Sequence, residues 1–233
     1  MTERILIVNA DDFGRCVAVN SGIVRAHEHG IVTSASLMVR WPAAGQAAEY
    51  AQERAALSVG LHLDLGEWVY RAGEWAPAYD VVAMDDAQAV ERESRRQLAA
   101  FRELVGRCPT HIDSHQHVHR ADPVATVART IAGELGVPLR GEGTVRHRGD
   151  FYGRTRDGPL HEAITPTALA TLIESLEPGV TELACHPGDG AETDPTYVDE
   201  RRLEVESLCD PRAREVIDRK GVLLRSFADA GAL

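Results

Sequence analysis

The chain has 233 residues, 44% hydrophobic and 26% charged, which is enough for one large globular domain with a substantial core. Its formal net charge of −11 argues against the basic surfaces that bind nucleic acid or anionic membranes, but not against a neutral sugar. We recognise no signal peptide, and no apolar run approaches the roughly 18 residues of a membrane span. The four cysteines are scattered without a C-x-x-C pair, which indicates reduced thiols. We therefore expect a single cytoplasmic domain over residues 1–233 with no nucleic-acid or membrane partner, and a homodimer is left open.

Strand and helix patterns alternate along the chain. The expected strands are 5–8, 33–39, 58–65, 110–114, 137–140, 180–185 and 222–225. The expected helices are 17–28, an alanine-rich helix from Pro42, one that includes 90–105, then 123–135, 165–175, 199–209 and 211–220. Residues 66–86 and 141–163 lack such periodicity and are expected to be loops. The first loop carries Trp68, Tyr70 and Trp75, and we expect at least one of these rings to line a substrate pocket.

Repeated strand–helix units with apolar strands predict a parallel sheet covered by helices. The count is near seven units, whereas a complete eight-unit barrel typically needs about 250 residues. Asp11, Asp12, His62, His115 and His186 all fall at the carboxyl ends of expected strands. A barrel brings these ends into one ring, whereas an open doubly wound sheet would spread them out. We therefore expect an α/β fold, namely a distorted (β/α) barrel of about seven units with mostly parallel strands.

Two adjacent carboxylates, Asp11 and Asp12, end the first expected strand. At the buried end of an apolar strand they repel each other and lose solvation, so each needs a partner. A metal ion is a plausible partner for Asp12, and a water molecule for Asp11 acting as a base. The alternative is a helix N-cap aspartate beside a surface aspartate. The irregular turn expected at Phe13-Gly14 favours the first interpretation, because it could aim both side chains inward.

Histidines supply the rest of a metal ligand set. His62 alternates with Leu61 and Leu63, so it faces the opposite side of its strand, which is the interior of a barrel. His115 is the first loop position after the fourth expected strand. Carboxylate and imidazole groups together bind divalent metals with open positions for water, so we expect Asp12, His62 and His115 to be metal ligands. The alternative for His62 is a hydrogen-bonded structural histidine.

Further histidines are candidates for other roles. Residues 111–119 carry four histidines, which cannot all bind one ion while leaving room for substrate and water. Some of them, with His117 and His119 as candidates, would orient ligands or contact substrate, unless the run is only an incidental metal-binding surface loop. His186 ends a late strand before Pro187, and its imidazole could protonate a leaving group near neutral pH. A structural loop histidine is the alternative there.

Five segments together resemble the YdjC-like carbohydrate deacetylases, which include chitooligosaccharide deacetylases and are related to the NodB-type polysaccharide deacetylases. The segments are Val8-Asn9-Ala10-Asp11-Asp12-Phe13-Gly14, Gly30-Ile31-Val32-Thr33-Ser34, Gly60-Leu61-His62, the run from Pro109 to His119, and Cys185-His186-Pro187-Gly188. The resemblance implies a distorted (β/α) barrel that hydrolyses an N-acetyl group from a sugar. By position, it implies that Asp11 is the catalytic base and that His186 is the acid. It also implies that Asp12, His62 and His115 are the metal ligands, and that Trp68 and Trp75 lie in a loop that shapes the substrate pocket.

These expectations combine in a metal-dependent deacetylase that acts on an N-acetylated saccharide or glycoconjugate. Its cofactor would be one divalent ion, Mg²⁺ by the family resemblance and Zn²⁺ by the preference of the ligand set. One alternative is another metallohydrolase on the same barrel, such as a phosphoesterase, although basic residues near the motifs are few. The other is a non-catalytic sugar-binding protein, which is disfavoured because every motif position carries a competent residue.

Overall fold

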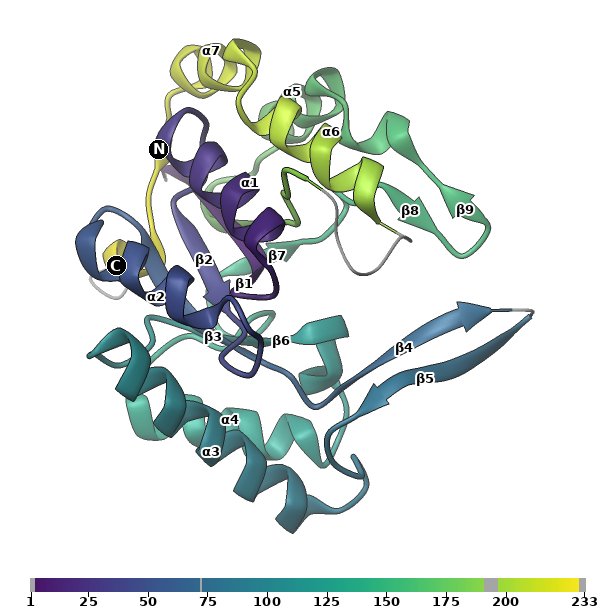
Figure 1. Ribbon diagram of the computed structural model, residues 1–233. Coiled ribbons are helices and arrows are strands. Elements are labelled where there is room, and N and C mark those ends of the chain that lie inside the picture. The colour runs from purple at the N-terminus through teal and green to yellow at the C-terminus, as the bar shows by residue number, and fades with distance from the viewer. Residues whose placement is uncertain (1–2, 72, 191–196, 231–233) are drawn as a thin grey trace.

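A curled parallel sheet forms the centre of the protein (Figure 1). The computed structural model describes residues 3–71, 73–190 and 197–230. Within these residues the strand order is β6-β3-β2-β1-β10-β7, and β11 pairs with β1 beside this path. The strands are β1 (Arg4–Phe13), β2 (Ser34–Leu37), β3 (Ser58–Leu63), β6 (Ile112–Ser114), β7 (Arg146–Arg148), β10 (Gly179–Cys185) and β11 (Val222–Leu224). β1 is buried along nearly its whole length, as expected for a central strand of a parallel sheet inside the protein.

The predicted α/β fold is confirmed, because the parallel strands curl into an incomplete (β/α) barrel. The strand predicted over residues 137–140 is reduced to a single parallel bridge between Leu139 and Ile112. Pro138 has no N–H to donate, and Gly141 turns the chain away at φ 76°. The following residues cross from the β6 edge of the sheet to the β10 edge, where β7 pairs.

Helices surround this sheet, with α3 and α4 on one side and α1, α6 and α7 on the other in the view of Figure 1. They are α1 (Val17–Glu28), α2 (Ala44–Glu53), α3 (Ala87–Val105), α4 (Val124–Leu135), α5 (Pro166–Glu174), α6 (Val198–Leu208), α7 (Pro211–Lys220), α8 (Phe227–Ala230) and the 3₁₀ turns η1 (His115–Arg120) and η2 (His161–Ile164). The cap Asp86 starts α3 by accepting hydrogen bonds from two backbone N–H groups, and Gly106 ends it in a left-handed conformation. Among the described helices, none is long and apolar enough to cross a bilayer.

The prediction of a loop over residues 66–86 is wrong, because most of this segment forms an antiparallel hairpin. Its strands are β4 (Gly66–Arg71) and β5 (Glu74–Asp80). The aromatic residues of this segment favour strands, and their pairing across the hairpin outweighs the Gly and Pro residues that suggested a loop. Figure 1 shows the hairpin projecting from the body of the protein. The second predicted loop, 141–163, contains β7, η2 and the short strands β8 (Arg154–Thr155) and β9 (Gly158–Pro159).

His111 belongs to the core and not to the site suggested by the histidine run. Its ring is fully buried and stacks on Phe227, with ring centroids 3.9 Å apart. The ring also covers Gly60, where an added Cβ would lie 2.4 Å from an imidazole carbon. The glycine of the Gly60-Leu61-His62 segment is therefore explained by this close approach.

Burial lowers the pKa of His111 to about 4, which predicts a specific loss of stability in acid. The unfolded state takes up a proton near the usual pKa of about 6.5, so this contribution to stability is complete above that pH and falls as the pH approaches 4. Between about pH 7.5 and about pH 5 the loss from this group is about 2 kcal/mol. Urea unfolding at both pH values should show a correspondingly shallower pH dependence in His111→Gln. Equal pH dependence in the two proteins would show that His111 is not the source.

Candidate active site

A bulge in β1 turns two adjacent carboxylates toward the same side. The register between β1 and β2 shifts between Ala10 and Phe13, and Asp12 has a left-handed φ of 67°. Neighbouring side chains on a regular strand point to opposite faces, whereas a bulge re-aims them. As a result Asp11 and Asp12 both line one cavity. The irregularity lies at the aspartates themselves, one or two residues before the predicted turn.

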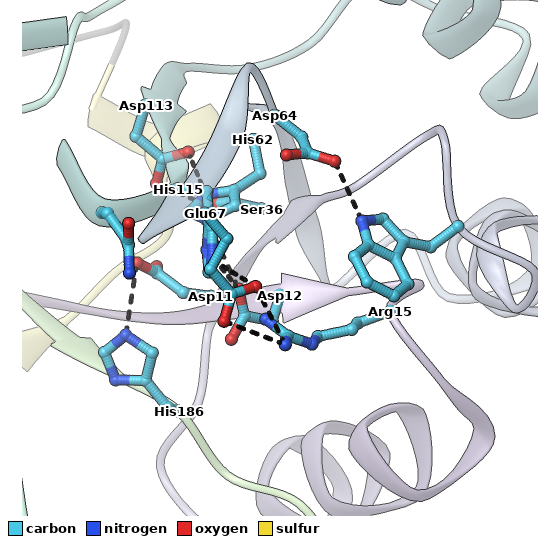
Figure 2. A network of polar contacts seen from close by, with 12 residues as sticks. Asp11, Asp12, Arg15, Ser36, His62, Asp64, Glu67, Asp113, His115 and His186 are labelled. Atoms are coloured by element: carbon cyan, nitrogen blue, oxygen red, sulfur yellow. Dashed lines mark hydrogen bonds and ion pairs between the residues drawn. The ribbon is translucent and has the colours of Figure 1, made fainter. Parts of the chain in front are cut away.

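The structure brings together the three side chains predicted as metal ligands (Figure 2). Asp12 Oδ1 lies 3.5 Å from His62 Nε2 and 3.2 Å from His115 Nδ1. One ligand atom from each residue lies within 4.8 Å of the other two. Asp12 Oδ1 is buried, yet it accepts no well-formed hydrogen bond from the described part of the chain. A buried oxygen left in this way beside two imidazole nitrogens fits a divalent cation.

Carboxylates lie behind both imidazoles. His62 Nδ1 lies 2.7 Å from Asp113 Oδ1, and His115 Nε2 lies 3.3 Å from Glu67 Oε2. Burial alone lowers the pKa of a histidine, but the neighbouring acids outweigh it: Asp113 raises the pKa of His62, and Asp12 together with Glu67 raises that of His115 to about 9. The surroundings therefore favour positive charge at this point, which is the electrostatic requirement of a cation site. Such outer carboxylates commonly orient ligating histidines.

Asp11 is held by a residue that the sequence interpretation did not assign to the site. The guanidinium of Arg140 forms two bonds of 2.6 Å, one to each oxygen of the Asp11 carboxylate. Burial opposes ionisation of Asp11, but Arg140 outweighs it and lowers the pKa to about 2. Asp11 is thus a fixed carboxylate at neutral pH. Arg140 is the last residue of the short fifth predicted strand, so the same strand-end rule that found the other residues could have found it.

Two further carboxylates compensate the buried charge of Arg140. Its Nε donates to Glu182 Oε1 at 2.7 Å, and its NH2 group lies 2.8 Å from Asp113 Oδ2. Because Asp113 also contacts His62, the residues that surround Asp11 and those that surround His62 form one network. A change at one point of such a network is felt at the others.

His186 lies on the other side of Asp11, with its Nε2 3.8 Å from Asp11 Oδ2. The buried Glu204 accepts a hydrogen bond from the His186 backbone N–H and another, at 2.6 Å, from the Tyr197 hydroxyl. Tyr152 packs edge-on against the imidazole at a centroid distance of 5.3 Å. Burial lowers the pKa of His186 to about 4, so the ring is neutral near pH 7 and available to accept a proton.

These groups lie on the floor of a cavity of about 870 Å³. Trp68, Tyr70 and Trp75 of the β4–β5 hairpin line it, and Trp75 remains 63% exposed. On the opposite side Arg156, between β8 and β9, donates a 2.7 Å hydrogen bond to the Tyr70 hydroxyl. The cavity is therefore bounded by both hairpins, and it combines aromatic faces with polar groups, as sugar-sized ligands require.

The two remaining histidines of the predicted site, His117 and His119, lie in different places. His117 lines the cavity, beside His147, which the sequence interpretation did not single out. His119 does not line it. Its Nδ1 lies 2.6 Å from Ser114 Oγ and its Nε2 3.1 Å from the Arg140 carbonyl oxygen. The structure thus brings His117 to the cavity wall and makes His119 a support for the backbone that carries Arg140.

Residues 5–219 match the family described as YdjC-like protein. The chain belongs to the YdjC-like family. A chitooligosaccharide deacetylase from Serratia marcescens is 31% identical over 263 residues, covering 97% of this chain and 99% of that relative. A carbohydrate deacetylase from Geobacillus stearothermophilus is 34% identical over 248 residues, covering 97% and 98% respectively.

Solved structures show a similarity in fold that covers nearly the whole chain. A protein from Enterococcus faecalis, described as a candidate for cellobiose-phosphate cleavage, matches with a TM-score of 0.82 and 27% identity over 98% of this chain and 99% of that chain. A family 4 carbohydrate esterase from Streptomyces lividans, solved in complex with acetate, matches with a TM-score of 0.58 and 14% identity. That match covers 96% of this chain and 92% of the esterase, and it shows a shared fold alone.

Proposed function

We propose that this protein is a metal-dependent carbohydrate deacetylase, which hydrolyses the N-acetyl group of an acetylated saccharide or glycoconjugate. The observation that carries this proposal is the position of Asp12, His62 and His115 beside Asp11 and His186 in one cavity. The full-length similarity to relatives named carbohydrate and chitooligosaccharide deacetylase supports it. All four cysteines are free thiols, which supports a cytoplasmic location.

Asp12, His62 and His115 would hold one divalent cation. When bound, the cation supplies Lewis-acid chemistry, since it polarises the acetamide carbonyl and makes water more acidic. One carboxylate oxygen and two imidazole nitrogens suit Zn²⁺, whereas the family resemblance implies Mg²⁺, so both ions belong in the test.

Asp11 is the proposed general base, because Arg140 keeps it ionised and fixes its orientation. The carboxylate takes a proton from the attacking water, whose oxygen joins the acetyl carbon. His186 is neutral beforehand and lies 3.8 Å from Asp11, so it is placed to receive this proton from Asp11 and to deliver it to the departing nitrogen. This delivery matters because an amide nitrogen leaves poorly as an anion. The C–N bond then breaks to give acetate and a free amine.

The decisive experiment measures amine release from a panel of N-acetylated mono- and oligosaccharides. The protein is first treated with a chelator and then supplied separately with Zn²⁺, Mg²⁺ or Mn²⁺. We expect activity to vanish on chelation and to return with one of these ions. Sugar binding without amine release under any ion would favour the non-catalytic alternative. Phosphate release from sugar phosphates without deacetylation would favour another metallohydrolase.

The aromatic residues of the hairpin are predicted to contact the sugar. Trp75→Ala and Tyr70→Ala each remove a ring that lines the cavity, and such contacts are worth about 0.5–1.5 kcal/mol. We expect KM for an acetylated oligosaccharide to rise about 2- to 10-fold, with kcat nearly unchanged. Val17→Ala is a suitable control, since Val17 is an exposed apolar residue that does not line the cavity. Unchanged KM and substrate preference in both ring variants would refute the contact.

A further inference from the structure

Glu67 is a buried charged residue near the base of the projecting hairpin. The residues of β5 are mostly exposed, whereas Glu67 on β4 is only 6% exposed. Its carboxylate points back into the body of the protein, where one oxygen lies 3.1 Å from Arg15 and 3.3 Å from His115 Nε2. Figure 2 shows Glu67 close to Asp12 and His115 in the same polar network. The hairpin therefore contributes a buried charge to the centre of the site.

The two nitrogens of His115 face different partners. Nδ1 faces Asp12 Oδ1, in the predicted metal cluster, and Nε2 faces Glu67. A neutral imidazole carries one proton, so a ring that offers the Nδ1 lone pair to a cation must carry its proton on Nε2. That N–H would lie beside the negative Glu67 carboxylate, 3.3 Å from Oε2, although Nε2 forms no well-aligned hydrogen bond with any described residue. Glu67 thus favours the tautomer that His115 needs, as Asp113 does for His62.

A second contact joins Trp68, the residue after Glu67, to Gln116, the residue after His115. The Trp68 backbone N–H donates to Gln116 Oε1 at 2.9 Å, and Gln116 Nε2 donates to the Trp68 carbonyl at 2.8 Å. Gln116 has a left-handed φ of 52°, which turns its side chain toward β4 immediately after His115. Consecutive residues of β4 are therefore fastened to consecutive residues of the loop that carries a predicted ligand.

We propose that the β4–β5 hairpin is a functional part of the metal site, in which Glu67 is the positioning residue for His115. This inference rests on the metal site of the proposed function. Because binding free energies are reciprocal, a hairpin that strengthens cation binding must itself be docked more firmly when the cation is bound. The aromatic rings that line the cavity are carried by this hairpin, so cation binding also fixes the surface proposed to receive the sugar.

The test compares Glu67→Gln with a matched control on the same hairpin, Glu74→Gln, whose side chain is exposed. Zn²⁺ affinity is measured by calorimetric titration of the chelated protein, without substrate. We expect Glu67→Gln to weaken Zn²⁺ binding about 10- to 100-fold and Glu74→Gln to leave it unchanged. Equal Zn²⁺ affinity in Glu67→Gln and wild type would overturn the proposal, because a residue that positions His115 for the cation must change the affinity when it is replaced.

Hydrogen–deuterium exchange of residues 66–80 supplies an independent measurement. In the wild type, Zn²⁺ is expected to slow amide exchange in the hairpin, and in Glu67→Gln this effect should largely disappear. Gln116→Glu is a second variant, since a carboxylate cannot donate to the Trp68 carbonyl, and it should also reduce the Zn²⁺-dependent protection. Equal amide exchange rates in the wild-type hairpin with and without Zn²⁺ would contradict the proposed coupling between the hairpin and the cation. If Asp12→Ala bound Zn²⁺ as well as the wild type, the metal site of the proposed function would fail instead.

Discussion

Replacing Asp12, His62 or His115 with alanine is expected to abolish bound metal and deacetylase activity together. Each substitution removes one of the three ligand atoms that lie within 4.8 Å of one another. With only two protein ligands left, the affinity should fall further than the 10- to 100-fold typical of an outer carboxylate. Metal content by elemental analysis and amine release from an acetylated sugar are the two measurements. His29→Ala, at an exposed histidine, is the control for a general effect of losing an imidazole.

The reasoning depends on the two losses occurring in the same variants. A variant that loses its metal but keeps deacetylating would show that the cation is not required for catalysis. If each of the three single variants kept its metal, another group would be the one that holds the ion. The alanine substitutions also alter a buried cluster of one acid and two imidazoles, so they can change the stability of the fold. Thermal unfolding of each variant should therefore be measured as well, to distinguish loss of the metal site from loss of folded structure.

Much of the fold follows from the order of apolar strands and capped helices. The predicted helices 17–28 and 211–220 have the bounds of α1 and α7, and the strand before His186 differs from β10 by one residue. These elements carry local signals, such as the proline at the start of α7 and the glycine at its end. The β4–β5 hairpin lacked them, because its residues form strands only by pairing with each other at a distance from the core.

The candidate site was predictable to the extent that it follows strand ends. Asp11 and Asp12 lie on β1, His62 lies on β3, and His115 and His186 directly follow β6 and β10; the parallel barrel gathers these four strand ends in one cavity. The acidic or basic side chain that contacts each of these residues was not predictable. These partners are set by the curvature of the sheet and the path of loops across its open side, and neither leaves a periodic trace in the sequence.

The partners lie far from these residues in the sequence, which explains why they were not predictable. Arg140 meets Asp11 across 129 positions of sequence, and Asp113 meets His62 across 51. The bulge that turns Asp11 and Asp12 to one side is likewise visible only as a register shift against β2. Composition around these residues contains no signal for such contacts, so the sequence interpretation named the chemical groups and the structure supplies the network that sets their protonation.

The two adjacent aspartates are predicted to fail in different ways when each is changed to asparagine. Asp11→Asn removes the proposed base but leaves Asp12, His62 and His115 intact. Arg140 keeps Glu182 and Asp113 as partners, so its charge stays compensated and the fold should survive. We expect nearly normal metal content and a single-turnover rate lower by roughly 10²- to 10⁴-fold, which is the usual value of a positioned proton transfer.

Asp12→Asn should instead weaken metal binding, because a neutral amide is a poorer ligand for a divalent cation than a carboxylate. It also leaves Arg201 without the negative charge of the Asp12 carboxylate, its ion-pair partner, which adds positive charge beside the cation and weakens binding further. Metal analysis and single-turnover rates on both variants distinguish the outcomes. Loss of metal in Asp11→Asn with retention in Asp12→Asn would mean that the roles are reversed. Full activity in both would mean that the tandem is structural, and the bulge that places these carboxylates side by side would then need a different explanation.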